Sequence, residues 1–172
     1  MTQLLDKKQI DQAISRLADM IIESSGDEVV ILGIRDRGEI LSERLSKIIT
    51  SRAGKTALSG ALDITLYRDD ITEPSGAMRA VQPSYIPCPL NDKEIILADD
   101  VLHTGRSCRA ALDAIVAYGR PRLIKLAVLI DRGGREYPIQ ADYTGVKLEV
   151  RDDQKVRVTL EEYGDIDQAV LE

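Results

Sequence analysis

The sequence of 172 residues contains no tryptophan and no phenylalanine, and its aromatic side chains are six tyrosines. The hydrophobic core is therefore expected to consist of leucine, isoleucine, valine and alanine. The single histidine, His103, excludes a metal site built from several histidines. The two cysteines, Cys88 and Cys108, lack a metal-binding spacing, and we expect two reduced thiols rather than a disulfide.

Long apolar runs and an excess of positive charge are absent as well. No stretch reaches the roughly 20 apolar residues needed to cross a bilayer, and the polar segment Met1–Lys8 does not resemble a signal peptide. We therefore expect a cytoplasmic protein. The 29 acidic and 23 basic residues give a net charge of −6. This charge argues against broad, non-specific binding of nucleic acids but leaves room for a local basic patch.

Helical and strand-like patterns alternate along the chain. Apolar residues recur with helical spacing in residues 4–24, 40–49 and 108–118, and strands are predicted at 29–34, 61–67, 95–98, 123–130, 141–143 and 156–160. The alternation predicts an α/β fold with a central, mostly parallel sheet flanked by helices, in a single domain over residues 1–172. The proline-rich stretch 69–89 predicts a long loop, and loops of that length are often lids over a functional site.

The segment Ile95–Ser107 carries the strongest chemical signal. Its apolar run ends in two adjacent acids, Asp99 and Asp100, and the short polar loop Thr104–Ser107 then leads into a helix. The N-terminus of a helix offers unpaired N–H groups and a positive dipole end to a phosphate, and Gly105 lets the backbone approach that anion.

Carboxylates beside a phosphate site suit sugar hydroxyls, or Mg²⁺ and its waters, rather than the phosphate itself. A sugar that carries a 5'-phosphate and free 2'- and 3'-hydroxyls would satisfy both halves of the segment. The alternative is an ordinary buried strand that is capped by aspartate and followed by a helix. That alternative explains the apolar run but neither the paired acids nor the loop.

The segment resembles the phosphoribosyl-diphosphate (PRPP) motif of type I phosphoribosyltransferases. Further segments resemble the PyrR-type regulators of pyrimidine operons within that family: residues 33–38, 63–70, 119–121, 126–133 and 135–143. The resemblance as a whole extends from about Val29 to Val158. The resemblance implies the type I phosphoribosyltransferase fold, with a small hood and a long mobile loop. It also implies a uracil phosphoribosyltransferase that makes UMP and diphosphate from uracil and PRPP with Mg²⁺, in a homo-oligomer, either a dimer or a tetramer.

The resemblance also assigns roles to individual residues. Asp99 and Asp100 would orient the ribose and reach Mg²⁺ through water, and Arg37 with the backbone of Asp36 would contact the diphosphate. The remaining PRPP-binding residues would be Val101, Leu102, His103, Thr104, Gly105, Arg106 and Ser107. Arg132 and Val156 would lie near the base, although Val156 also fits a plain core position. Arg79, in the long loop, is a candidate cation for closing the site, and no protein cage for a metal is expected.

Many PyrR-type proteins also bind the leader of pyrimidine-operon messenger RNA when UMP or UTP is present. Three positions at which the family carries basic or polar residues hold Gly134, Gln140 and Val146 here, and the segment Glu149–Asp153 is acidic on balance. The catalytic pattern is thus complete and the RNA-reading pattern is eroded. Basic residues elsewhere could rebuild an RNA surface: Arg16, Arg151, Lys155 and Arg157.

Three functions therefore compete. The first is a uracil phosphoribosyltransferase, the second is a UMP-sensing RNA-binding regulator with little turnover, and the third is a phosphoribosyltransferase for another nucleobase.

Overall fold

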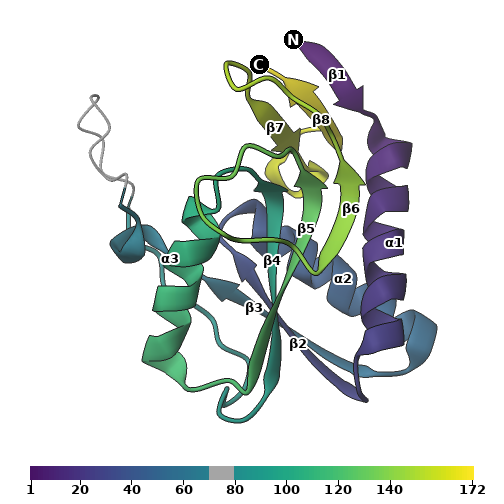
Figure 1. Cartoon of the computed structure of the whole chain (residues 1–172). Helices are drawn as coiled ribbons and strands as arrows, with labels where there is room; N and C mark the ends of the chain where they lie inside the picture. Colours follow the sequence, from purple (N-terminus) through teal and green to yellow (C-terminus); the bar gives the residue numbers. More distant parts are fainter. Residues whose placement is uncertain (70–79) are drawn as a thin grey trace.

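A five-stranded parallel sheet forms the centre of the computed structural model, which describes residues 1–69 and 80–172 (Figure 1). The strand order is β3-β2-β4-β5-β6, and the strands are β2 (Glu28–Ile34), β3 (Thr56–Leu62), β4 (Glu94–Leu102), β5 (Leu123–Asp131) and β6 (Tyr143–Lys147). The chain first moves outward from β2 to β3 and then returns to place β4 on the other side of β2. In parallel α/β sheets ligands bind at such a reversal, beyond the carboxyl ends of the strands.

Helices cover both faces of this sheet (Figure 1). On one face lie α1 (Lys7–Ser24) and α2 (Arg37–Ala53), whose apolar residues join a core cluster with strand residues such as Ile31 and Leu129. On the other face lies α3 (Arg106–Ile115), which packs its alanines against Leu97 and Val128. The core is aliphatic, as the composition predicted, and one tyrosine, Tyr143, lies buried in it.

A second sheet of three short antiparallel strands lies at one end of the molecule, in the order β1-β8-β7 (Figure 1). Its strands are β1 (Thr2–Leu5), β7 (Val156–Thr159) and β8 (Gln168–Leu171), and the turn η3 (Glu161–Tyr163) lies between β7 and β8. We call this sheet with its connection, residues 2–5 and 156–171, the hood. The prediction of a helix from Leu4 was wrong, because Leu4 and Leu5 belong to β1 and a capping box between Asp6 and Gln9 starts α1 at Lys7.

Two further boundaries differ from the sequence prediction. The strand expected at 61–67 ends at Leu62, and Thr65–Tyr67 form the 3₁₀ turn η1. Strand β4 continues through both acids to Leu102, because its pairing with β5 extends from Glu94 to Leu102, whereas its pairing with β2 stops at Ala98. The acids thus lie where β4 has lost one of its two neighbours, so their side chains can reach the crevice between β2 and β4.

Of the residues 69–89 that were expected to form a long loop, the structure describes Asp69 and residues 80–89, and Arg79 lies outside the described residues. From 80 to 89 the chain carries one isolated bridge, between Tyr85 and Ala61. Helix α3 ends at Ile115 and passes into the 3₁₀ turn η2 (Val116–Tyr118).

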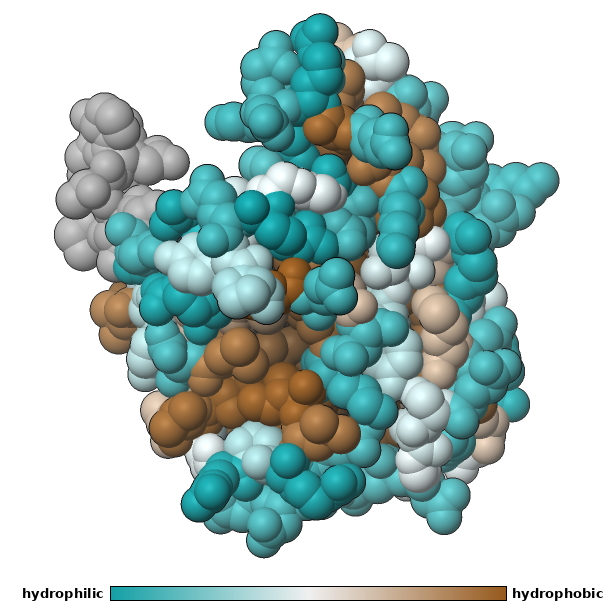
Figure 2. Space-filling model, in the orientation of Figure 1, coloured by the Kyte–Doolittle hydropathy of each residue, from teal (hydrophilic) through white to brown (hydrophobic). Residues whose placement is uncertain are grey.

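Figure 2 shows an apolar area on the side of α3 and β5, toward the lower part of the view. Exposed apolar residues of α3, η2 and β5 are Leu112, Val116 and Leu123. Among the helices within residues 1–69 and 80–172, none has the length and apolar character to span a membrane.

Candidate functional site

The turn from β2 to α2 lies unusually close to β4. A side chain at Gly33 would clash with the carbonyl oxygen of Gly38, and a side chain at Gly38 would clash with the carbonyl oxygen of Ala98. The Arg35–Asp36 peptide bond in this turn is cis. Asp36 is the N-cap residue of α2, but its side chain makes no capping hydrogen bond to the N–H groups of the first turn. Because these two glycines have no side chains, the positive N-terminal end of α2 can lie against Ala98, the residue directly before Asp99.

The paired acids lie at the end of β4, facing this turn. Asp99 and Asp100 are both half-buried, and an Asp99 oxygen accepts a hydrogen bond of 2.9 Å from the N–H of Asp100. Arg37 approaches Asp100 with an N–O distance of 4.0 Å. Burial, and then the neighbouring charge of Asp100, raise the pKa of Asp99 well above its usual range. An arriving cation or hydroxyl donor would therefore relieve an unfavourable pair of charges.

A pocket of about 160 Å³ joins the predicted elements. Its walls come from the end of β2 and the β2–α2 turn, from the residues directly before and after η1, from the end of β4 and from the start of α3: Ile34, Arg35, Asp36, Arg37, Ile64, Arg68, Asp99, Asp100, Val101 and Ser107. The structure thus brings together the expected diphosphate turn, the acids and one residue of the expected phosphate loop. Cationic and anionic side chains face the same small space.

Hydrogen bonds from residues 131–139 stabilise the expected phosphate loop. Gly105 has a φ of 90° and is the N-cap of α3, a conformation that favours glycine. The carbonyl of Thr104 accepts hydrogen bonds from the N–H groups of Glu136 and Tyr137, at 2.9 and 3.0 Å, and the carbonyl of His103 accepts one of 3.0 Å from Arg135. The conformation of the loop is therefore preorganised by contacts within the protein.

The side chain of Arg106 is engaged on the protein itself. It pairs with Asp69 at 2.9 Å and with Glu136, and its guanidinium lies 5.6 Å from the centre of the Tyr137 ring. The hydroxyl of Tyr137 donates a hydrogen bond of 2.9 Å to the same carboxylate of Asp69. The backbone N–H of Arg106 also has a partner, since it donates a hydrogen bond of 3.2 Å to the hydroxyl oxygen of Thr104. A phosphate at this loop would therefore replace the Thr104 oxygen as the acceptor for that N–H, while the side chain of Arg106 stays engaged on the protein.

The predicted base-contact residues, Arg132 and Val156, lie beyond the paired acids. Arg132 is buried, and its guanidinium donates hydrogen bonds of 2.6 Å to the carbonyl of Gln154 and 2.9 Å to that of Arg151. Its Nε is buried and has no hydrogen-bond partner within residues 1–69 and 80–172. Val156 and Val101 both pack against the core cluster. Arg132 therefore shapes the connection before β7 through backbone contacts, a role that its sequence neighbourhood does not reveal.

His103 lies close to this group. Burial, and then the charge of Arg132, lower the pKa of His103, so the ring is neutral at physiological pH. A Cβ atom at Gly134 would come within 2.8 Å of the His103 ring nitrogen Nε2. The space that a side chain at position 134 would enter is therefore occupied by the ring of His103.

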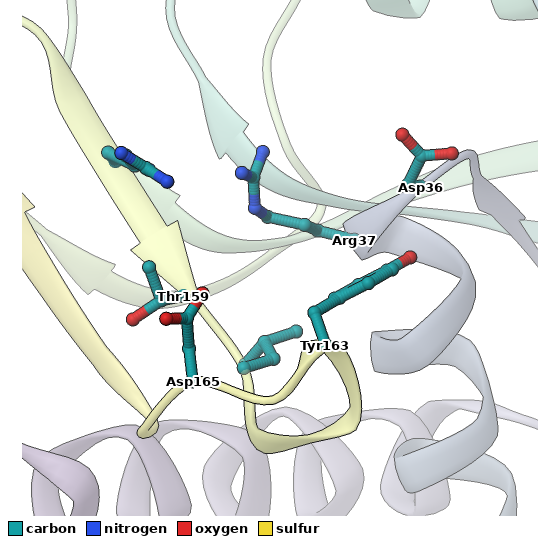
Figure 3. Close-up of a pocket in the computed structure, with 7 residues that line it drawn as sticks. Asp36, Arg37, Thr159, Tyr163 and Asp165 are labelled. Carbon is teal, nitrogen blue, oxygen red and sulfur yellow. The ribbon is translucent and has the colours of Figure 1, made fainter.

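A second pocket, of about 250 Å³, shares Asp36 and Arg37 with the first (Figure 3). Its other lining residues belong to the hood: Arg157, Thr159, Leu160, Tyr163 and Asp165. Sequence reasoning did not assign these residues to the site. A usable signal was present, because Arg157 and Thr159 alternate along β7 with the apolar residues Val156 and Val158.

The candidate ligands for a hard cation at this site are the adjacent carboxylates of Asp99 and Asp100. Among the described residues, no group of three or more His, Cys, Asp or Glu side chains is arranged to hold a metal ion. Asp99 and Asp100 offer oxygen atoms of the kind that Mg²⁺ and its waters prefer, and the raised pKa of Asp99 marks a place where added positive charge is favourable. The donor set fits a magnesium ion that arrives with an oxygen-rich substrate.

Comparisons with known proteins show to which family the chain belongs. Residues 1–163 match the family model for the phosphoribosyl transferase domain. The chain is 47% identical over 171 residues to the bifunctional protein PyrR of Alkaliphilus metalliredigens, covering 98% of this chain and 93% of that one. It is 43% identical to the bifunctional protein PyrR of Clostridioides difficile, with 98% and 96% covered.

Solved structures resemble the model in fold. A hypoxanthine phosphoribosyltransferase of Trypanosoma cruzi has a TM-score of 0.74 at 15% identity, with 99% of this chain and 90% of that chain covered. A hypoxanthine-guanine phosphoribosyltransferase of Bacillus anthracis has a TM-score of 0.72 at 17% identity, with 100% and 97% covered. At these identities the likeness concerns the fold alone.

Proposed function

Because the chain belongs to the phosphoribosyl transferase family, and within it to the bifunctional PyrR proteins, we propose that it joins uracil to PRPP and releases UMP and diphosphate. The family resemblance drawn from the PRPP motif and the expected α/β fold are both confirmed. The single observation that carries the proposed reaction is the pocket shared by Arg37, Asp99, Asp100 and Ser107. This pocket supports the proposal because it brings the expected diphosphate turn, the pair of acids and the expected phosphate loop together at one switch in strand order.

The two ends of PRPP would be bound by two helix N-termini. The 5'-phosphate would sit on the backbone of Thr104–Ser107 at the start of α3, and the diphosphate would sit at Asp36–Arg37 at the start of α2. Asp99 and Asp100 would accept hydrogen bonds from the ribose hydroxyls between them. Mg²⁺, when bound with PRPP, would offset the charge of the diphosphate and be held through water by the two acids.

Positive charge develops on the ribose as the bond from C1' to the diphosphate breaks, while negative charge develops on the leaving group. Arg37 and the positive end of α2 would stabilise the diphosphate, and Asp99 and Asp100 would stabilise the ribose. We place uracil beside Val101 and Val156, on apolar surface at the edge of the hood. Arg132 would act there by holding the carbonyls of Arg151 and Gln154 in position.

A substrate panel tests this proposal. Purified protein is incubated with PRPP, Mg²⁺ and one of uracil, hypoxanthine, guanine or orotate, and nucleotide formation is measured. We expect UMP from uracil and little nucleotide from the other bases. Turnover of a purine or of orotate instead would assign the chain to another base. A correctly folded protein that makes no nucleotide would refute the enzyme reading.

Asn substitutions at the paired acids separate activity from stability. Asp99→Asn or Asp100→Asn should lower turnover by about 10- to 150-fold, because each removes a charge-assisted contact of about 1.5–3 kcal/mol. Because burial raises the pKa of Asp99, its ionised form opposes folding at neutral pH, and Asp99→Asn should unfold at a temperature no lower than wild type. Steady-state assays measure the turnover, and thermal melts measure the unfolding temperature. Wild-type turnover in both variants would contradict the proposal that Asp99 and Asp100 bind the ribose hydroxyls.

The acid limb of the pH profile should depend on both acids. Because the pKa of Asp99 is raised, kcat/KM for PRPP should fall as pH drops through that raised value, where the carboxylate becomes protonated. Asp100→Asn removes the neighbouring charge that contributes to the shift, so its acid limb should move to lower pH. A limb that stays in place in this variant would show that another group controls it.

A second function is suggested by the word bifunctional in the names of the relatives. The resemblance to PyrR-type regulators implies binding of a pyrimidine-operon leader RNA. Two basic residues that could support it already have acidic partners, since Arg151 pairs with Asp153 at 3.2 Å and Arg157 pairs with Glu172 at 3.2 Å. Phosphate binding by these side chains would compete with their own ion pairs.

We therefore expect weak and unselective RNA binding. The affinity for the native pyrimidine leader should equal that for a scrambled RNA of the same length, and both should decrease steeply as salt rises. Gel shifts with and without UMP, at several salt concentrations, measure this. A UMP-dependent shift that occurs with the native leader alone would establish the regulatory function.

The proposal also includes a cytoplasmic location and a homo-oligomer, a dimer or a tetramer. Fractionation of cells and sedimentation of the purified protein test these two parts.

A further inference from the structure

The second pocket is bounded on one side by the diphosphate turn and on the other by the hood. Asp36 and Arg37 line it from the start of α2, and residues from Arg157 to Asp165 line it from β7 and the connection that follows (Figure 3). Its volume is about 250 Å³. Arg37 is common to both pockets, so a ligand at Arg37 can extend into either one.

The hood side of this pocket carries hydrogen-bond donors. Arg157 and Thr159 occupy alternate positions of β7, whereas Val158 between them is fully buried in the core. In Figure 3 the ring of Tyr163 runs toward the first turn of α2, below Asp36 and Arg37. Burial, and then the charges of Asp36 and Glu39, raise the pKa of Tyr163, so its hydroxyl stays protonated and can donate.

The stereochemistry of the reaction decides which part of the substrate this pocket can receive. The incoming base and the departing diphosphate lie on opposite faces of C1'. A space that shares its walls with the diphosphate turn therefore belongs to the leaving group, and the base must lie elsewhere. The apolar side chains of Val101 and Val156, beside which we place the base, pack against the core cluster and are not among the residues that line this pocket.

We propose that Arg157 and Tyr163 bind the terminal phosphate of the diphosphate group, so that the hood completes the leaving-group site. This inference rests on the proposed function and names two further residues for it. Asp36 and Asp165 also line the pocket, and their charges oppose those of the two arginines. The pocket therefore suits diphosphate complexed with magnesium better than the bare anion. Arg157 pairs with Glu172 at 3.2 Å through Nη1, so a phosphate would bind the other N–H donors of this guanidinium or displace Glu172.

Binding of the product diphosphate tests the proposal without turnover. Tyr163→Phe removes only the hydroxyl, and Arg157→Met removes the charge while keeping the length of the side chain. Each variant is titrated calorimetrically with magnesium diphosphate and, separately, with UMP. We expect the Kd for magnesium diphosphate to rise about tenfold in each variant, as for loss of one hydrogen bond to a charged group. The Kd for UMP should stay unchanged, because UMP has no group in this pocket.

Matched controls come from the opposite end of the sheet. Tyr118→Phe alters an exposed tyrosine in η2, and Arg122→Met alters an exposed arginine that pairs with Glu94 at 3.4 Å. Both should bind magnesium diphosphate and UMP as wild type does.

The outcomes separate this inference from the proposed reaction. Unchanged affinity for magnesium diphosphate in both hood variants would overturn the inference, and so would an equal loss of UMP affinity, which would make the pocket a base or nucleotide site. A tenfold loss of diphosphate affinity alone would support it. If that loss occurs in a protein that makes no UMP from uracil, the proposed reaction fails and the leaving-group assignment stands.

Discussion

Gly38→Ala should abolish PRPP binding, although alanine ordinarily stabilises a helix over glycine by about 1 kcal/mol. The Cβ atom of the new residue would clash with the carbonyl oxygen of Ala98 and lie 3.3 Å from Cα of Asp99. Both neighbours are backbone atoms of the central strand β4 and cannot rotate away. The first turn of α2 would therefore move away from the acids, and the pocket that joins Arg37 to Asp99 would open.

The variant should also lose about 1–3 kcal/mol of folding free energy, the usual cost of overpacking. Calorimetric titration with PRPP and denaturant unfolding measure the two effects. Gly26→Ala is the matched control, because a Cβ atom at Gly26 would meet no atom within 4 Å. Its stability and PRPP affinity should equal those of wild type. Retained PRPP binding by Gly38→Ala would contradict the close approach of α2 to β4 as a requirement of the site.

The second large effect is expected from Arg44→Ala, which should lower the free energy of unfolding by about 3–5 kcal/mol. Arg44 donates to both oxygens of Asp167, at 2.6 and 3.0 Å, and its side chain is 15% exposed. The side chain of Asp167 is 1% exposed. Removing Arg44 would leave this carboxylate buried without its cation.

The same pair joins the two walls of the second pocket. Arg44 belongs to α2, which carries Arg37, and Asp167 follows the hood residues Tyr163 and Asp165. Arg44 also binds Glu162 at 2.6 Å, and Asp167 accepts a hydrogen bond of 2.8 Å from the N–H of Glu161. A loosened hood should therefore accompany the loss of stability, and it would be visible as faster amide hydrogen exchange in residues 160–168.

The pH dependence distinguishes the ion pair from simple packing. Burial alone would raise the pKa of Asp167, but hydrogen bonds from Arg44 and from the backbone N–H of Glu161 lower it overall. Because the folded-state pKa lies below that of the unfolded chain, the carboxylate stabilises the fold at neutral pH. That contribution is lost as pH falls through the lowered pKa. The stability difference between wild type and Arg44→Ala should therefore shrink in acid.

Arg52→Ala is the control on the same helix. Arg52 pairs with Asp19 at 2.6 Å, but both side chains are about half exposed, at 43% and 55%. Such pairs contribute about 0–1 kcal/mol. Urea unfolding of both variants at neutral and acidic pH measures the contrast. Equal, small losses in the two variants would show that the Arg44–Asp167 pair is no more than a surface contact.

Contiguous segments account for what could be predicted of the site. The strand, the acids, the phosphate loop and the start of α3 follow one another within Ile95–Ser107, so their relative placement depends on local geometry. The same holds for the β2–α2 turn, where Gly38 follows Arg37 directly. The roles of residues whose partners lie far along the chain could not be predicted from the sequence. Arg132 binds carbonyls 19 and 22 residues further along the chain, which no local pattern shows.

The sequence by itself determined the α/β class, the aliphatic core and the PRPP motif, because hydrophobic periodicity and helix-start chemistry are properties of neighbouring residues. The strand predicted at 156–160 is confirmed as β7, and a small hood was expected from the resemblance, but tertiary structure alone decided how the hood is assembled. In it Thr2 pairs with Leu171 across nearly the whole chain, and β1 and β8, of four residues each, are too short to be predicted from a periodic pattern. Tertiary structure also decided the second pocket, because Arg37 and Tyr163 meet only when the hood packs over the start of α2.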